Sequence, residues 1–258
     1  MKVTVIVAAH KPYAMPKDPL YLPLHVGAQG KGSFGFIGDD IGESITDKNP
    51  TFCELTGLYW AWKNLKADYV GLAHYRRHFG GTKRDKGNPL ACVLTEEQAV
   101  RLLEGKDGIL PKKRKYYIET LYSHYAHTMH VEPLDLTGEI LREKYPAYVE
   151  AFEELKKRRS AHMFNMMILR KDHLNAYCTW LFDILFELEK RVDASAYDAF
   201  HGRFFGRVSE LLLDVWLSQN PLDLVEVPVV NVEKTNWFKK GGSFLMAKFF
   251  GKKYEKSF

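Results

Sequence analysis

Apolar runs of strand length alternate with helical patterns from residue 3 to residue 230, and this alternation limits the fold more than any other feature of the sequence. Continuous β-branched and small apolar runs predict buried strands, whereas apolar residues three and four apart predict helices. We expect strands at 3–9, 67–73, 107–110, 162–169 and 224–230, and helices at 51–65, 95–104, 136–144, 147–158, 172–192 and 206–217. This order is typical of an α/β domain.

Two polar segments interrupt the alternation near the N-terminus. Residues 11–33 are rich in Pro and Gly and are expected to form a long loop, and residues 39–49 a second loop that faces a ligand. Thr51 and Glu54 then fit a capping box, in which the hydroxyl and the carboxylate bind free backbone amides. The helix expected over 51–65 therefore has a defined start.

The positive charge of the chain is concentrated at its C-terminal end. The chain has 37 Lys and Arg against 32 Asp and Glu; seven of the lysines and one of the acids fall within residues 234–258, so residues 1–233 have a net charge of −1. A nearly neutral body argues against nucleic acid as a partner. The segment 234–258 interleaves lysines with Phe and Leu, which suits an anionic membrane surface, and a solvated terminus is the alternative. We expect a domain over 1–233 and a basic, aromatic tail over 234–258.

The cysteines and the hydropathy bear on the cellular compartment. Cys53, Cys92 and Cys178 are far apart and form no CxxC pair, which argues against a disulfide framework and a zinc knuckle and favours a reducing compartment. No uncharged apolar run approaches the roughly 20 residues of a membrane-spanning helix. We therefore expect a cytoplasmic protein, peripheral on the inner face of the plasma membrane if the tail binds lipid.

Cationic residues directly follow two of the expected strands. His74, Arg76 and Arg77 come after the strand at 67–73, and the run Lys112, Lys113 and Arg114 follows the strand at 107–110. Ligands of α/β sheets bind at the carboxyl ends of the strands. Guanidinium and ammonium groups there could neutralise a diphosphate as it leaves, and the alternative is a solvated basic face. This arrangement predicts an anionic small-molecule ligand.

Two sets of residues are open to a metal interpretation. Asp39 and Asp40 have the hard oxygen ligands that Mg²⁺ or Mn²⁺ would take, and they also suit a turn. His124, His127 and His130 are spaced three apart, which spreads them round a helix and lacks the i, i+4 pair of zinc enzymes. For these histidines, substrate contact or partial burial is favoured over metal binding.

Two further polar residues are candidates for the chemistry. Asn165 falls within an apolar strand pattern, where its amide needs partners and could bind a sugar hydroxyl or make a structural hydrogen bond. Glu210 falls in the first turn of the helix expected at 206–217, where it could favour the helix dipole or act as general base for an acceptor hydroxyl. Neither pair of alternatives is decided by the sequence.

Several common active-site motifs do not occur. There is no GxxxxGK[ST] loop and no GxGxxG after the first strand, which argues against P-loop and dinucleotide-binding domains. There is also no GxSxG elbow, and Cys53 lies in a helical pattern that assigns it to packing.

An ordered series of motifs resembles one bacterial family. The segments that carry the resemblance cover nearly all of residues 1–233 and are 10–19, 39–43, 48–64, 69–79, 110–114, 122–127, 162–167, 180–189 and 205–210. The family was catalogued as a domain of unknown function, DUF4422, and its members are capsular or exopolysaccharide glycosyltransferases. The resemblance implies a single GT-A-type, Rossmann-like domain that binds a nucleotide sugar on a mostly parallel central sheet.

The resemblance also suggests roles for the candidate residues. Many GT-A enzymes carry an Asp-x-Asp metal motif at the position where this chain has His74-Tyr75-Arg76. The need for Mn²⁺ or Mg²⁺ is therefore open. Arg76 or Arg77 is expected to take over part of the role of the metal cation. The residues expected to contact the donor are His10, Tyr13, Asp39, Asp40, Asn49, Glu54, Arg77, Lys112, Arg114 and Asn165. His124 and His127 are expected to face the acceptor. Glu210, Arg76 and His74 are the candidate catalytic residues, with Glu210 as base if the anomeric centre is inverted.

The implied activity is transfer of a sugar from a nucleotide diphosphate donor to a surface glycan. A uridine-based donor is expected, and UDP-galactofuranose is one candidate. The acceptor would be a growing capsular polysaccharide, exopolysaccharide or lipopolysaccharide glycan, free or lipid-linked. The alternative is a non-catalytic carbohydrate- or nucleotide-binding module, which would bind its ligand without turnover.

Overall fold

Nine strands form one sheet in the computed structural model, which describes residues 1–233. The main path of the sheet runs β10-β6-β9-β4-β1-β2-β3, and β5 and β11 are attached at the side of β4. Every neighbouring pair along the main path is parallel except the two that involve β9. The strands are β1 (Val3–Ala9), β2 (Tyr21–His25), β3 (Ile37–Gly38), β4 (Tyr69–His74), β5 (Arg77–Phe79), β6 (Gly108–Pro111), β9 (Met167–Arg170), β10 (Leu224–Val227) and β11 (Val229–Asn231). The expected α/β class with a mostly parallel sheet is confirmed.

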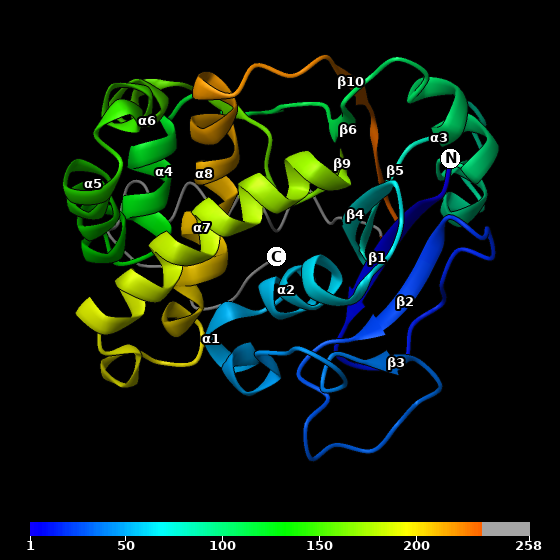
Figure 1. Ribbon diagram of the computed structural model, residues 1–258, viewed down its shortest axis with the longest axis horizontal. Helices are drawn as coiled ribbons and strands as arrows, with labels where there is room; N and C mark the ends of the chain where they lie inside the picture. The colour runs from blue at the N-terminus through cyan, green and yellow to red at the C-terminus, as the bar shows by residue number, and fades with distance from the viewer. Residues whose placement is uncertain (234–258) are drawn as a thin grey trace.

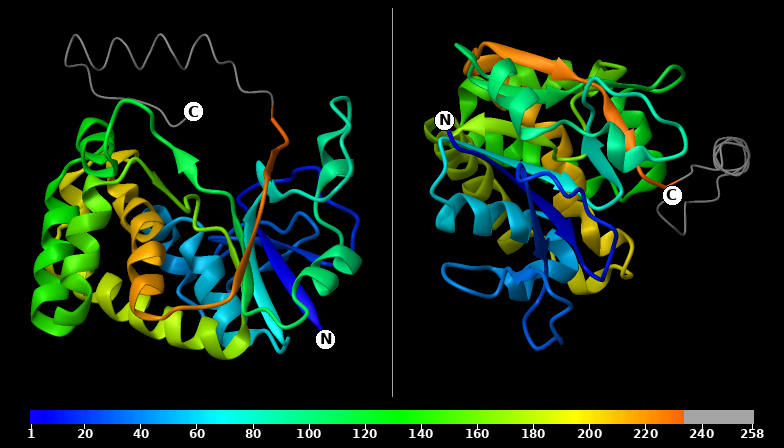
Figure 2. Two further views of the ribbon diagram at one scale, coloured as in Figure 1. Left: turned by 90° about the horizontal axis from the view of Figure 1, so that it is seen from above. Right: turned by 90° about the vertical axis from the view of Figure 1, so that its right-hand side faces the viewer.

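Helices cover both faces of this sheet (Figure 1). The main helices are α1 (Asn49–Phe52), α2 (Leu55–Asn64), α3 (Glu96–Leu102), α4 (Leu121–Thr128), α5 (Glu132–Lys144), α6 (Val149–Lys157), α7 (Lys171–Arg191) and α8 (Phe204–Gln219). Alternate side chains of β1 enter different cores, because Ile6 packs with the α2, α7 and α8 side whereas Val5 and Val7 pack with the α3 side. The left view of Figure 2 places the helices α4 to α8, coloured from green through yellow to orange, together on one side of the strands.

The helix expected over 51–65 is broken in two. Cys53 lies between α1 and α2 with φ of +53°, and the Thr51 hydroxyl donates to the carbonyl of Lys48 instead of capping a helix. The capping-box prediction is therefore wrong. The ring of Phe52 at the end of α1 stacks on the ring of Phe205 in α8, with ring centres 4.2 Å apart. Packing between α1 and α8 therefore holds the chain at the break.

Two other sequence predictions need correction. The loop expected at 11–33 contains β2, which pairs in parallel with β1 and which its prolines had concealed. The strand expected at 162–169 is shorter, because β8 (Ser160–Ala161) pairs with β7 (Arg114–Lys115) and a turn separates β8 from β9. Asn165 therefore lies in that turn and not within a strand.

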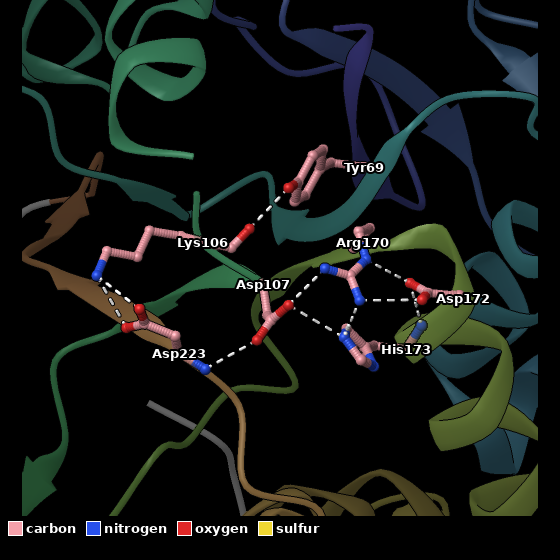
Figure 3. Close-up of polar contacts among 7 residues, drawn as sticks. All are labelled: Tyr69, Lys106, Asp107, Arg170, Asp172, His173 and Asp223. Atoms are coloured by element: carbon pink, nitrogen blue, oxygen red, sulfur yellow. Dashed lines mark hydrogen bonds and ion pairs between the residues drawn. The ribbon is translucent and has the colours of Figure 1, made fainter. Parts of the chain in front are cut away.

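A polar network joins the start of β6 to the end of β9 (Figure 3). Asp107 accepts hydrogen bonds from the Arg170 guanidinium (2.6 Å), from the His173 ring (3.1 Å) and from the backbone N–H of Asp223 (2.9 Å). Asp172 accepts two hydrogen bonds from the Arg170 guanidinium, at 2.8 Å and 3.0 Å. These contacts join three segments that are far apart in the sequence.

We predict that this network makes stability depend on acid pH. The hydrogen bond from Asp223 and the nearby cations lower the pKa of Asp107, and Arg170 lowers the pKa of Asp172 to about 2. A carboxylate with a lowered pKa stabilises the fold above its unfolded pKa of about 3.9, and that stability is lost as the pH falls below this value. Asp107→Ala should reduce the free energy of unfolding by about 1–3 kcal/mol at pH 7, measured by urea denaturation.

The control is Glu104→Ala, because Glu104 is an exposed acid whose side chain has no partner within residues 1–233. Equal stability of the two variants at pH 7 would contradict the role assigned to Asp107.

Candidate functional site

The candidate site lies at the edge of the sheet where β1, β4 and β6 end. His10 follows β1, His74 ends β4, and Arg114 lies shortly after β6. Since β9 runs antiparallel to β4 and β6, the turn that precedes β9 arrives at this same edge. The sheet thus collects residues from four separate parts of the chain, as expected for a ligand site of an α/β domain.

The turn before β9 is held in an uncommon backbone conformation. Phe164 and Asn165 have φ of +75° and +53°, and together with Cys53 they are the non-glycine residues with positive φ within 1–233. The His74 Nε2–H donates to the Phe164 carbonyl, and the Asn165 Nδ2 donates to Glu54 Oε1 (2.7 Å) and to the Gly206 carbonyl (3.0 Å). Strained backbone that neighbouring contacts fix in this way is frequent at functional sites.

Two arginines approach the ring of Phe164. The guanidinium carbon of Arg77 lies 4.5 Å from the centre of the ring and that of Arg114 lies 5.6 Å from it. Arg114 also lies 4.7 Å from the ring centre of Tyr116. Both side chains are partly buried, and within residues 1–233 neither guanidinium makes a hydrogen bond or an ion pair. Each guanidinium has five N–H donors, so the pair can bind an anion.

Two carboxylates lie next to these cations. Glu210 in α8 has a side chain only 9% exposed, and its Oε1 lies 3.5 Å from Arg207 Nη1. Burial raises the pKa of Glu210, and the charge of Glu54 adds to this, whereas Arg207 opposes it. Glu210 also lowers the energy of the buried charge on Arg77, whose pKa is lowered chiefly by burial. A carboxyl with a raised pKa beside a set of arginines is a candidate proton acceptor.

The position of Glu210 in its helix differs from the expected one. Because α8 begins at Phe204, Glu210 lies in the second turn and not the first. An interaction with the helix dipole is confined to the first turn, so that explanation for Glu210 is removed.

Aromatic rings lie at the end of β1. Tyr13 stacks on Tyr75 with ring centres 3.7 Å apart, and His10 meets Tyr75 edge to face at 5.3 Å. The Arg76 guanidinium lies 5.1 Å from the centre of the Tyr75 ring and pairs with Glu233 at 3.7 Å. Burial and neighbouring cations lower the pKa of His10, so this ring is neutral at pH 7. His10 and Tyr13 are therefore grouped as the sequence predicted, and their contact with a nucleoside stays a prediction.

Asp39 has a structural role in place of the expected ligand role. It is fully buried, and its two carboxylate oxygens accept four hydrogen bonds, from the backbone N–H groups of Gly27 and Ala28 and from the hydroxyls of Thr46 and Thr56. Four donors occupy the lone pairs of a carboxylate, so none is left for a nucleoside or a metal. The prediction for Asp39 is corrected on this ground.

Asp39 and Asp40, the two acids expected to hold a metal ion, do not form a metal site together. Asp40 is exposed, and its neighbour Asp39 has no free oxygen lone pair to share a cation with it. Residues 1–233 hold no group of three or more His, Cys, Asp or Glu placed to bind a metal ion.

Asn49 and Lys112, two other residues that were expected to contact the donor, make contacts elsewhere in the protein. The Asn49 Nδ2 donates to the Cys53 carbonyl (2.7 Å) and to the Thr56 hydroxyl (3.2 Å), so its amide holds the junction of α1 and α2. Lys112 is exposed at the end of β6, where its backbone N–H binds the Val227 carbonyl. Direct donor contact by either side chain stays a prediction.

His124 and His127, which were expected to face the acceptor, bind the same carboxylate. Glu119 is buried, and it accepts hydrogen bonds from His124 Nδ1 at 2.9 Å and from His127 Nδ1 at 2.6 Å. The His124 ring packs on Tyr116 with centres 4.4 Å apart, which connects it to Arg114. Because the Nδ1 atoms face Glu119, the Nε2 atoms of both rings point away from it.

The sequence interpretation missed Phe164, Tyr75, Arg207, Tyr116 and Glu119. Phe164 had one available signal, because the neighbouring Asn165 tolerates positive φ and suggests a turn within an apolar run. Arg207 lies three residues before Glu210, which is one helical turn, and this spacing predicts an ion pair. Glu119 had no comparable signal, since its partners are defined only by the fold.

The structure is an α/β sheet with cations collected at the carboxyl ends of its strands, where ligands of such sheets bind. The family model described as a domain of unknown function (DUF4422) matches residues 4–221, and the chain belongs to this family. A solved structure described as the apo structure of the bifunctional glycosyltransferase WbbM is similar, with a TM-score of 0.81 and 32% sequence identity over 91% of this chain. The chain spans 46% of the length of that protein. No curated protein matches the chain.

We predict that Glu119 sets the protonation of His124. Burial lowers the pKa of His124 and the hydrogen bond to Glu119 opposes this shift, so loss of the carboxylate charge should lower the pKa further. Glu119→Gln keeps the size of the side chain and should shift the NMR titration of the His124 ring to lower pH. The His173 ring, which binds Asp107 at 3.1 Å, serves as the unaffected control within the same spectra. An unchanged or higher pKa of His124 would contradict the assignment.

Proposed function

We propose that the protein is a glycosyltransferase that transfers a sugar from a nucleotide diphosphate donor to a glycan acceptor. The observation that carries this proposal is the pair of partly buried arginines, Arg77 and Arg114, which lie across Phe164 with no carboxylate bound to either. Such cations match the charge of a diphosphate. The description of the similar structure as a glycosyltransferase supports the same activity.

The leaving group would be stabilised by arginine side chains. As the bond between the anomeric carbon and the phosphate oxygen breaks, its electron pair leaves with the diphosphate, and Arg76, Arg77 and Arg114 would neutralise the added charge. Arg76 would exchange its partner Glu233, 3.7 Å away, for a phosphate oxygen. Partial burial strengthens each of these interactions relative to water. The arrangement gives the arginines the role that a metal ion has in other transferases.

Glu210 is the proposed general base of an inverting reaction. An acceptor hydroxyl oxygen would form the new bond to the anomeric carbon, and its proton would pass to the Glu210 carboxylate. The raised pKa of Glu210 brings its basicity nearer to neutral pH, where proton transfer is most efficient. Glu54, which Asn165 holds at 2.7 Å, would maintain this shift by its charge. His74 would act by fixing the Phe164 turn through its hydrogen bond to the carbonyl.

The donor and the acceptor would approach from different sides of this cluster. His10 and Tyr13, at the end of β1, are the proposed contacts of the nucleoside, and a uridine nucleotide, with UDP-galactofuranose as one candidate, is the proposed donor. His124 and His127 are the proposed contacts of the acceptor, a capsular, exopolysaccharide or lipopolysaccharide glycan that is free or lipid-linked. Their Nε2 atoms would bind acceptor hydroxyls while Glu119 fixes the Nδ1 atoms.

Membrane association is a separate part of the proposal. Within residues 1–233, no helix combines the length and the apolar character that crossing a bilayer requires. The basic and aromatic segment 234–258, proposed to contact anionic lipid at the inner face of the plasma membrane, lies outside the described residues. Deletion of this segment tests its role by vesicle binding.

We predict that nucleotide binding depends on Arg77. A ligand that binds the native state raises the thermal midpoint, so UDP should raise it more than GDP, CDP, dTDP or ADP do. Arg77→Ala should abolish the shift, whereas Arg101→Ala, which removes an exposed arginine of α3, should leave it unchanged. The screen with EDTA, Mg²⁺ and Mn²⁺ tests the role of arginine directly, because a shift that requires a divalent cation would contradict it.

We predict that Glu210→Gln reduces turnover by about 10²- to 10⁴-fold, the usual contribution of a general base. The UDP-induced thermal shift should persist, since Glu210 is not assigned to the diphosphate. In the wild type, kcat/KM should rise with pH through the pKa of Glu210, which lies above the ordinary value of about 4.3, because the ionised form is active. Undiminished turnover in Glu210→Gln would remove Glu210 as base.

The same measurements separate the enzyme from a binding module. Nucleotide or carbohydrate binding without sugar transfer to any acceptor, and with no effect of Glu210→Gln, would favour the non-catalytic alternative.

A further inference from the structure

A short ribbon beside the site has one face turned to solvent. β7 (Arg114–Lys115) pairs with β8 (Ser160–Ala161) in a two-stranded sheet separate from the main one. The pairing continues beyond β7, because the Tyr116 N–H donates to the Arg159 carbonyl at 2.7 Å and the Leu121 N–H donates to the Arg158 carbonyl at 2.8 Å. In the left view of Figure 2 the green segment that joins β6 to α4 runs along the margin of the helices.

Side chains alternate between the two faces of this ribbon. Arg114 and Tyr116 face inward, toward Phe164 and His124. Lys113, Lys115 and Tyr117 are exposed, as the period of two in an extended chain requires. The ribbon therefore has one face in the candidate site and the other in solvent.

The exposed side chains of this ribbon and of the residues next to it include apolar and cationic groups, and we call this surface the basic ribbon face. It consists of Lys112, Lys113, Lys115, Tyr117, Ile118, Arg158 and Arg159. Tyr117 is 82% exposed and Ile118 is 59% exposed, the two highest values among the exposed large apolar residues of 1–233. Adjacent exposed apolar residues of this size indicate an interaction surface.

The cations of the basic ribbon face form no close ion pairs within residues 1–233, although the charge of Arg158 acts on the Glu154 carboxylate. None of the three lysines and two arginines forms an ion pair within residues 1–233, and the Arg159 side chain donates only to the Tyr117 carbonyl at 3.4 Å. Glu119, the acid that follows Ile118 in the chain, is buried and bound to His124 and His127. The surface is therefore locally positive on a body whose net charge is −1.

We infer that the basic ribbon face docks the protein on an anionic lipid bilayer. Lysine and arginine side chains at a bilayer surface bind headgroup phosphates, and exposed Tyr and aliphatic side chains enter the interface below them. Ile118 favours lipid over nucleic acid, because a branched aliphatic side chain cannot stack on a base. This surface is distinct from the segment 234–258.

Docking in this orientation would place a lipid surface across the ribbon from Arg114 and Tyr116. A lipid-linked acceptor could then reach His124 and His127 from the bilayer. This consequence rests on the proposed function, whereas the docking itself does not.

The test is co-sedimentation of the full chain with vesicles of phosphatidylglycerol and phosphatidylcholine. Each cation near an anionic surface strengthens binding about fivefold, so Lys113→Gln/Lys115→Gln should lower the partition coefficient by roughly 25-fold at low salt. Tyr117→Ser/Ile118→Ser should weaken it by a factor that does not change with salt, because salt screens the electrostatic part alone. The matched control is Lys83→Gln/Lys86→Gln, with the same charge change in the exposed loop between β5 and α3.

Three outcomes would overturn the inference. The first is wild-type vesicle binding by both ribbon variants, which would leave the segment 234–258 as the whole membrane contact. The second is equal loss in the control variant, and the third is loss of oligonucleotide binding with vesicle binding intact. All variants should keep the wild-type thermal midpoint, since the changed side chains are exposed. The UDP-induced shift and turnover of a soluble acceptor are measured in parallel, so a failure of the proposed function is seen separately.

Discussion

The turn formed by Phe164 and Asn165 is the constraint on which the candidate site depends. Its backbone has positive φ at both residues, and the hydrogen bonds from His74 to the Phe164 carbonyl and from the Asn165 amide to Glu54 and Gly206 hold it there. These contacts come from the end of β4, the start of α2 and the start of α8. The turn therefore holds Glu54 directly, and it is tied to α8, the helix that carries Glu210, through the Gly206 carbonyl.

The carboxylates of the candidate site have partners within the protein, whereas two of its arginines form no ion pair within residues 1–233. Arg207 lies beside Glu210, and Asn165 binds Glu54, so both carboxylates have partners within the protein. Arg77 and Arg114 lie against aromatic rings and form no ion pair within residues 1–233, although the charge of Glu210 acts on both. Aromatic faces and a carboxylate at this range offset only part of the cost of burying a cation. A bound diphosphate, as proposed, would add negative charge beside these two arginines.

The sequence was sufficient for the α/β class because the spacing of apolar residues indicates which strands and helices are buried. The strand at Val3–Ala9 was predicted with the bounds that the structure shows, and the cations after β4 and β6 were expected at the ligand edge from the direction of the strands. The sequence was insufficient where a long-range contact decides local structure. Thr51 and Glu54 have the spacing of a capping box, yet Glu54 binds Asn165, which is 111 residues away. Asp39 has the composition of a ligand, but its environment of four donors exists only after folding.

The direction of β9 has a consequence for how this site can change over evolution. In a parallel sheet the loops of the ligand edge follow their strands, so their lengths can vary without moving the strand. Here the turn precedes β9, whose residues pair with both β4 and β6, and whose Met167 and Ile168 enter opposite cores. A one-residue insertion in the turn would shift this register and exchange the two side chains between the cores. Diversification is therefore easier in the segments after β1, β4 and β6 than in the turn that they surround.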